Sequence, residues 1–185
     1  TARFPLFALG LPARRVRLAV SASTFLDRSF RTAYSTTSQF DGVPVTGTET
    51  IDSRGSIGDI RFAAAGSVRR WLRVGVAAHV LSGENRVLTR RAFTDSTRFA
   101  VLDDSVTIDY RGTALSGGVE FIPVRGLSVT TAYRAGQGLR AVRRDTTVAR
   151  GTVPDRLSAG VRFDRVTGAT FVASWARTRW SQMGS

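Results

Sequence analysis

The chain has 185 residues, about the size of one domain, and 42% of them are hydrophobic, which excludes an intrinsically disordered protein. It has no cysteine and one histidine, His79, which excludes disulfide scaffolds, thiol nucleophiles and zinc sites built from cysteine and histidine. Its net charge is +13, and all 27 basic residues are arginine, so a nucleic-acid or anionic partner has to be weighed. No apolar run reaches the roughly 20 residues of a membrane helix.

Apolar residues alternate with polar or small residues along most of the chain, which predicts strands rather than helices. In chain order, the clear runs cover residues 16–26, 58–68, 72–80, 113–121, 127–135 and 157–163, and residues 1–10 and 169–180 form two weaker runs. Their length is close to the roughly ten residues that a tilted strand needs to cross a bilayer. The chain is therefore predicted to be all-β.

Short turns and long polar connections alternate along the chain. The turns fall at 11–15, 69–70, 123–126 and 164–168, and the long connections at 31–56, 82–105 and 136–154. Outer-membrane barrels have this arrangement, because their periplasmic turns are short and their extracellular loops are long. We predict one domain over residues 1–185, an antiparallel up-and-down meander of about eight strands, with all short turns at one end. Both termini would then lie on the loop side, so we expect the domain to be part of a larger barrel.

The charged residues of these runs share the face opposite the apolar residues, and alanine, glycine and serine accompany them. Small residues beside occasional charges are typical of a crowded barrel lumen. We expect Leu18, Val20, Phe62, Val74, Val76, Val129 and Val161 on one face and the arginines on the concave face. Asp59 would pair with Arg61, and Glu120 with arginines of a neighbouring strand. The candidate lumen-lining or substrate-binding residues are Arg17, Asp59, Arg61, Arg73, His79, Glu120, Arg134 and Arg162.

Two strands complicate this assignment. Val106, Ile108 and Tyr110 alternate out of step with Leu115, Val119 and Phe121, so either a bulge lies near Gly112 or this part extends beyond the membrane. In the last strand we expect Arg177 and Arg179 to face inward together with Phe171, Ala173 and Trp175, because an arginine that faces lipid costs about 2–4 kcal/mol. Lipid would then contact Thr170, Val172, Ser174, Ala176 and Trp180. Aromatic residues cluster near the ends of the strands, as interfacial girdles do.

Other functions have less support in the sequence. The arginines are scattered over turns, lumen and loops, whereas a nucleic-acid binder concentrates its charge, so no nucleic-acid partner is expected. His79 has Asp59 and Ser82 as its nearest partners in sequence, but no G-x-S-x-G motif surrounds either one. We expect a hydrogen-bonded lumenal histidine and no enzyme. The pair Asp103–Asp104 is expected to be solvated, and the glycines at 117–118 precede no helix, so neither a metal, a phosphate loop nor any cofactor is predicted.

Two segments resemble the FadL/TodX family of outer-membrane transporters for hydrophobic compounds. They are VTIDYRGTALSGGVEFIPVRGLSVTTAYRAGQGL, with its Tyr-x-Gly strand, short Pro-containing turn and Tyr-Arg, and IGDIRFAAAGSVRRWLRVGVAAHVLSGE, a hairpin around a short basic turn. The similarity extends over residues 14–180. It implies a monomeric 14-stranded barrel that an N-terminal hatch plugs and that passes fatty acids or aromatic hydrocarbons into the membrane. The hatch and its Asn-Pro-Ala motif have no counterpart here, so no substrate residue can be transferred.

The sequence therefore predicts a bacterial outer-membrane barrel that contacts lipid and transports hydrophobic small molecules such as long-chain fatty acids. Two alternatives stay open: a non-transporting barrel for adhesion or anchoring, and a basic β protein that binds nucleic acid.

Overall fold

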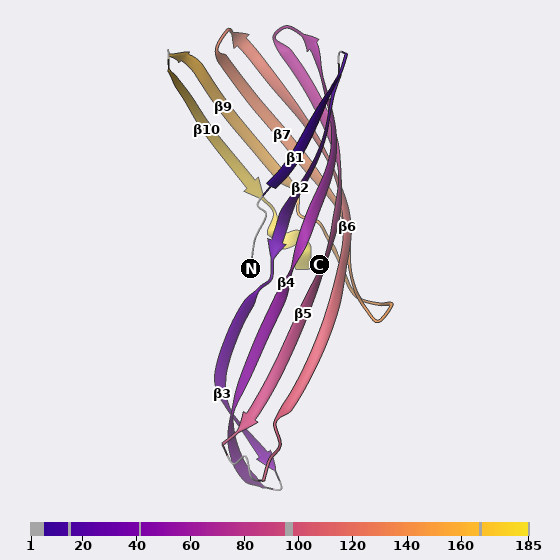
Figure 1. Ribbon diagram of the computed structural model, residues 1–185, viewed down its shortest axis with the longest axis vertical. Coiled ribbons are helices and arrows are strands. Elements are labelled where there is room, and N and C mark those ends of the chain that lie inside the picture. The colour runs from indigo at the N-terminus through magenta and orange to yellow at the C-terminus, as the bar shows by residue number, and fades with distance from the viewer. Residues whose placement is uncertain (1–5, 15, 41, 95–97, 167, 185) are drawn as a thin grey trace.

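Antiparallel strands make up nearly all of the computed structural model (Figure 1), which describes residues 6–14, 16–40, 42–94, 98–166 and 168–184. No helix among them is long and apolar enough to cross a membrane. The elements are β1 (Leu6–Ala13), β2 (Val16–Asp27), β3 (Phe30–Phe40), β4 (Val43–Arg69), β5 (Leu72–Phe93), β6 (Leu102–Val124), β7 (Leu127–Arg143), β8 (Thr146–Thr152), β9 (Arg156–Val166), β10 (Ala169–Thr178) and the 3-10 helix η1 (Trp180–Gly184).

The strands form one meander, in the order β1-β2-β4-β5-β6-β7-β9-β10, that curls into a half-barrel of eight strands. β3 pairs with the first half of β4, and β8 pairs with the end of β7. The short connections, after β1, β4, β6 and β9, lie together at the upper end in Figure 1. The all-β meander is confirmed, and the four predicted turns share one end. The prediction that every short turn lies at that end was wrong, because the equally short turn between β7 and β8 lies at the other end of β7.

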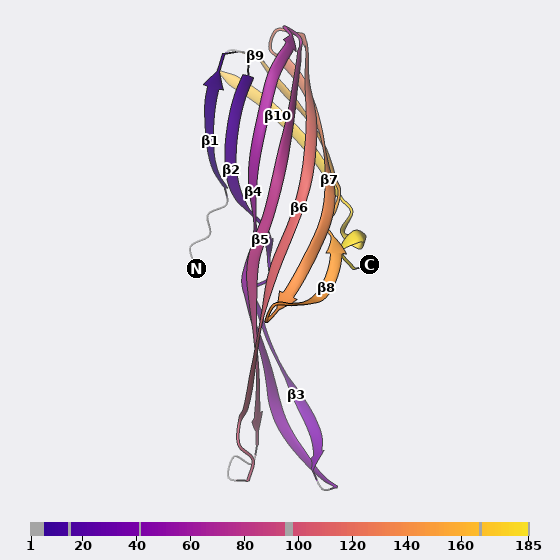
Figure 2. The ribbon, with the colours of Figure 1, turned by 90° about the vertical axis from the view of Figure 1, so that its right-hand side faces the viewer.

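The prediction of long loops was wrong. Most of residues 31–56, 82–105 and 136–154 are strand, and β7 and β8 are joined by a turn of only two residues, Arg144 and Asp145. Threonine, serine, valine and arginine alternate in these segments, a pattern that favours extended chain although the residues are polar. Figure 2 shows the result, in which β3, β4, β5 and β6 continue well below the level where the other strands end. We call the part made of β3 and residues 43–56, 82–93 and 102–112 the extension.

The register confirms the predicted separation of the two faces, because residues directly paired between strands share a face. Val20 pairs with Phe62, and Arg61 pairs with His79. The Arg134 guanidinium lies 5.1 Å from the centre of the Phe25 ring, although three strands separate β7 from β2 in the sheet. That contact spans the hollow side, so the face that carries the arginines is the concave one.

The predicted orientation of the last strand was wrong. Ala173 pairs with Val161, and Trp175 with Ala159, so Phe171, Ala173, Trp175 and Arg177 share the convex face with the apolar residues of β9. The prediction treated Arg177 as a residue in the middle of a membrane strand, but Arg177 lies near the end of β10, nine positions from Gly168. Trp180, expected on the convex face, lies in η1 with its ring 6.0 Å from that of Phe25.

The apolar side chains lie on the convex face of the sheet next to the short turns and on the concave face in the extension. Next to the short turns, the convex face carries exposed apolar side chains, which we call the apolar band: Leu18, Val20, Ile60, Phe62, Val68, Val74, Val76, Val80, Leu115, Val119, Phe121, Val129, Leu157 and Val161. In the extension the convex positions are mainly polar, and Val45, Phe93 and Tyr110 are buried on the concave face. Ile57 and Leu81, at its border with the rest of the sheet, are buried on the same face.

This inversion explains the change of alternation in β6. The pairing of β6 with β5 is uninterrupted, so the strand keeps its alternation while the apolar residues move from the convex to the concave side. A register shift does lie between Gly112 and Ala114, but it affects only the pairing with β7. A small core closes the concave side at this level, formed by Ile57, Leu81, Tyr110, Ala114, Leu139 and Val153.

Candidate functional site

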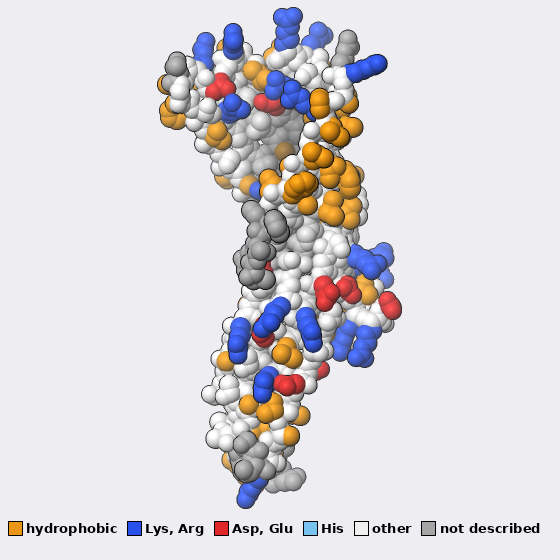
Figure 3. Space-filling view, viewed as in Figure 1, with side chains coloured by type: hydrophobic (Ala, Val, Ile, Leu, Met, Phe, Trp, Pro, Cys, Tyr) orange, Lys and Arg blue, Asp and Glu red, His pale blue; other side chains and the backbone are white. Residues whose placement is uncertain are grey.

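A hollow of about 480 Å³ lies on the concave face, above the small core. Strands β2, β4, β5, β6 and β7 contribute to it, and much of its wall consists of small side chains: Ala63, Ala65, Ala77, Ala132 and the glycines 75 and 118. Figure 3 shows the molecule hollowed beneath the arginine side chains at its upper end. Alternate residues of each strand point inward, and on the concave side of a curved sheet the inward side chains of neighbouring strands come close together. Small side chains fit these positions best.

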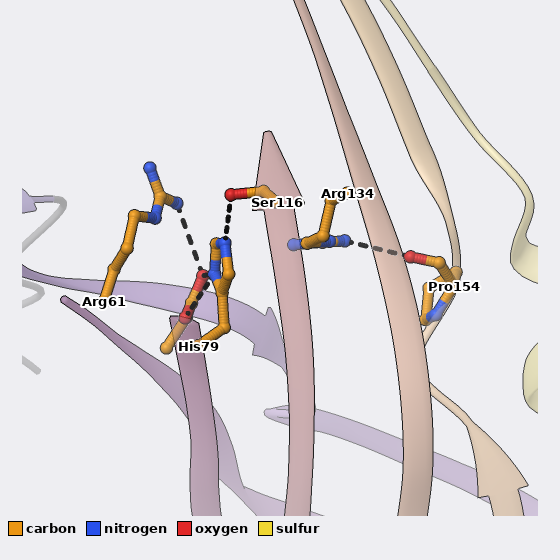
Figure 4. A network of polar contacts seen from close by, with 6 residues as sticks. Arg61, His79, Ser116, Arg134 and Pro154 are labelled. Atoms are coloured by element: carbon orange, nitrogen blue, oxygen red, sulfur yellow. Dashed lines mark hydrogen bonds and ion pairs between the residues drawn. The ribbon is translucent and has the colours of Figure 1, made fainter. Parts of the chain in front are cut away.

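A chain of hydrogen bonds lies at the closed end of this hollow (Figure 4). Asp59 on β4 accepts from Nδ1 of His79 on β5, at 3.0 Å to each carboxylate oxygen. Nε2 of the same imidazole lies 2.9 Å from the Oγ of Ser116 on β6. Asp59 and His79 are each only 3% exposed. Three adjacent strands thus hold a carboxylate, an imidazole and a hydroxyl in one line.

Two arginines flank this line. Nη2 of Arg61 donates to the Asp59 carboxylate at 3.4 Å. Nη2 of Arg134, a residue that pairs directly with Ser116 across β6 and β7, donates to the carbonyl oxygen of Pro154 at 3.2 Å. Within the described residues, the Nε atoms of Arg61 and Arg134 are buried and have no hydrogen-bond partner. These guanidiniums therefore retain unused donors next to the line of three groups.

All eight residues that the sequence singled out lie on the concave face, but they form three groups. Asp59, Arg61, His79 and Arg134 lie together around Ser116, which lines the hollow. Arg73 binds Glu120 across β5 and β6 at 3.0 Å and lines the same hollow with Arg17. Arg162 lies apart, near the short turn after β9, where it contacts Asp164 at 3.2 Å. The predicted pairs Asp59–Arg61 and Glu120–Arg73 are thus both present.

Ser116 is the site residue that the sequence analysis missed. Ser82, the partner considered for His79, pairs with Gly58 and lies on the convex face, so it cannot reach the imidazole. Ser116 is 37 residues from His79 in sequence, and only the β5–β6 pairing brings the two together. The one available signal was alternation, since Ser116 shares its inward parity with Gly118 and Glu120.

No metal centre was found in the part of the chain that the structure describes, because no three histidine, aspartate or glutamate side chains gather there. Asp103, half of the acidic pair noted in the sequence, lies 3.8 Å from Arg90. Comparisons with family models, with curated proteins and with solved structures find no match to this chain. The resemblance to the FadL/TodX family therefore stays a prediction.

Proposed function

We propose that this chain forms the wall of an outer-membrane β-barrel that passes hydrophobic compounds, such as long-chain fatty acids, across the bacterial outer membrane. The observation that carries the proposal is the apolar band. Its strands alternate over about nine positions between the short turns and the extension, close to the ~25 Å apolar belt of outer-membrane barrels. In water, so large an exposed apolar surface is unfavourable.

The inversion beyond the band supports the same placement. In lipid the apolar residues of a barrel face outward, whereas in water they have to turn inward and leave the outer surface polar. The extension has this second arrangement and would then project into water. Arginines at the short turns, including Arg14, Arg69, Arg70, Arg125 and Arg165, would lie at the level of the lipid headgroups. Figure 3 shows basic side chains gathered at this end of the molecule.

The hollow favours transport of a hydrophobic solute over a purely structural barrel. Its small side chains leave room that anchoring or adhesion does not require, and its charged residues are few. The arginines do not favour a nucleic-acid partner, because Arg134 is buried on the concave face and Arg73 is paired with Glu120 instead of being available to phosphates.

The test is uptake by liposomes that contain the full-length protein. A labelled long-chain fatty acid should enter with saturable kinetics, and Ala65→Phe, which narrows the hollow, should lower the rate severalfold. Ala78→Phe adds the same ring to the convex face of β5 and should leave uptake unchanged. Uptake no faster than in empty liposomes would overturn the transport proposal and favour an anchoring barrel. Large steady ion conductance without saturable uptake would instead favour a hydrophilic porin.

A further inference from the structure

We propose that Asp59, His79 and Ser116 form a nucleophilic triad that hydrolyses carboxylic esters with an apolar acyl chain. A serine hydrolase needs a hydroxyl within hydrogen-bond reach of a base and a third group that orients the base. Here Ser116 Oγ lies 2.9 Å from His79 Nε2, and the opposite nitrogen of the ring lies 3.0 Å from Asp59. This activity goes beyond transport, and it departs from the expectation of no enzyme, which considered Ser82 in place of Ser116.

The carboxylate sets the direction of the hydrogen bonds. An ionised Asp59 can only accept, so Nδ1 of a neutral His79 carries the proton and donates it. Nε2 then presents its lone pair to Ser116, whose hydroxyl becomes the donor. His79 is thereby held in the tautomer that removes a proton from a nucleophile.

The surroundings of Ser116 supply the two other requirements, access and a stabiliser of negative charge. Ser116 is partly exposed and lines the hollow, so a substrate that fills the hollow reaches its Oγ. The Arg134 side chain lies beside it (Figure 4), is 8% exposed and retains a buried Nε–H without a partner among the described residues. Because Arg134 pairs directly with Ser116 across β6 and β7, its positive charge lies close to the place where the oxyanion of a tetrahedral intermediate forms and stabilises it.

The wall of the hollow selects the substrate class. Next to Ser116 it consists of small, mostly apolar residues such as Ala77, Gly118 and Ala132, which leave space for a chain of methylene groups. A carboxylic ester with its acyl chain in this space would place its carbonyl carbon at Ser116.

The reaction proceeds in two balanced stages. Ser116 Oγ bonds to the carbonyl carbon while its proton passes to His79 Nε2, and the positive charge of Arg134 stabilises the resulting oxyanion. The bond from carbon to the alcohol oxygen breaks, and that oxygen takes the proton from Nε2, which leaves an acyl-serine and a free alcohol. Water then attacks the acyl carbon and gives its proton to Nε2, and Ser116 leaves with that proton. The net change is ester plus water to acid plus alcohol.

The first test is covalent labelling of the full-length protein, folded in detergent micelles, with an alkyl fluorophosphonate. Attack by Ser116 forms an Oγ–P bond and expels fluoride, so mass spectrometry should locate the phosphonyl group on the peptide that contains Ser116. Ser116→Ala should abolish labelling and His79→Asn should slow it at least tenfold, whereas Ser82→Ala should be labelled like the wild type. A folded wild type that stays unlabelled at Ser116 would overturn the proposal.

The second test separates catalysis from a purely structural network. The folded fraction of each variant is measured by its heat-dependent electrophoretic mobility, and hydrolysis of a long-chain p-nitrophenyl ester is normalised to it. Ser116→Ala and His79→Asn should lower kcat by about 1,000-fold or more. Equal kcat per folded molecule in the wild type and Ser116→Ala would refute the triad.

Discussion

At the scale of single residues, the concave face satisfies its buried charges through partners on adjacent strands. Glu49 on β4 is 9% exposed and illustrates this in the extension. Its carboxylate accepts from the Tyr34 hydroxyl of β3 at 2.7 Å and from the Arg91 guanidinium of β5. The hydrogen bond from Tyr34 first, and then that from Arg91, hold the pKa of Glu49 below its ordinary value.

A lowered pKa in the folded state makes stability depend on pH. Glu49 contributes stability that is present above the pKa of the unfolded carboxyl and is lost as pH falls through the lowered folded value. The urea midpoint of the wild type should therefore fall as pH is lowered from 6 to 3. In Glu49→Gln, the midpoint should already be lower at pH 6 and should change less with pH.

The matched control is Asp103→Asn, because Asp103 is exposed and its arginine partner lies 3.8 Å away. Its urea midpoint should follow the wild type at every pH, since exposed ion pairs contribute little. An unchanged pH profile in Glu49→Gln would show that the Tyr34–Glu49–Arg91 contacts do not stabilise the fold.

At the scale of elements, β4 and β5 approach each other unusually closely where the apolar band ends. Gly55 and Gly83 are the residues that allow this approach. A Cβ built on Gly83 would lie 2.1 Å from the carbonyl oxygen of Ser56, and a Cβ on Gly55 would lie 2.1 Å from that of Glu84. The two strands can therefore approach this closely only because these inward positions lack side chains.

Gly83→Ala should consequently separate the two strands and destabilise the fold by about 1–3 kcal/mol, the usual cost of overpacking. Gly138→Ala on β7 is the control, because a Cβ there meets nothing within 4 Å. Urea unfolding followed by tryptophan fluorescence measures both variants. Equal midpoints for Gly83→Ala and the wild type would contradict the close approach of β4 and β5.

At the scale of the whole molecule, the apolar band and the extension carry their apolar side chains on opposite faces of the sheet. Val76 is 67% exposed in the middle of the apolar band, and Leu88 is 38% exposed on the same convex face of β5, but in the extension. One strand thus provides matched positions on the two sides of the proposed membrane boundary.

Val76→Arg should lower the stability of the protein in lipid vesicles by about 2–4 kcal/mol, because the guanidinium would face hydrocarbon. Leu88→Arg should be tolerated within about 0.5 kcal/mol, because that position would face water. Urea titration in vesicles, read by heat-dependent electrophoretic mobility, measures both changes. Equal effects of the two substitutions would place the apolar band outside a membrane.

The sequence by itself determined the period-two alternation, and with it the all-β fold, the short turns and the inward face of Arg61 or Arg134. These features are local, because side chains of a strand alternate between two faces whatever its partners are. Residues 31–56 were wrongly predicted to be a loop because they are polar. A polar composition indicates that side chains contact water, and an extended strand can do so as well as a loop.

The tertiary structure alone decided what lies next to what across the sheet. The register of the strands brings His79 next to Ser116, 37 residues further along the chain. It also places Ser82 on the convex face, and Phe171 and Trp175 on the same face as Val161. A shift of one residue in pairing would reverse each of these contacts without altering the alternation of any single strand. The faces of this protein could therefore be derived from its residues, whereas its site exists only through the pairing of β4, β5, β6 and β7.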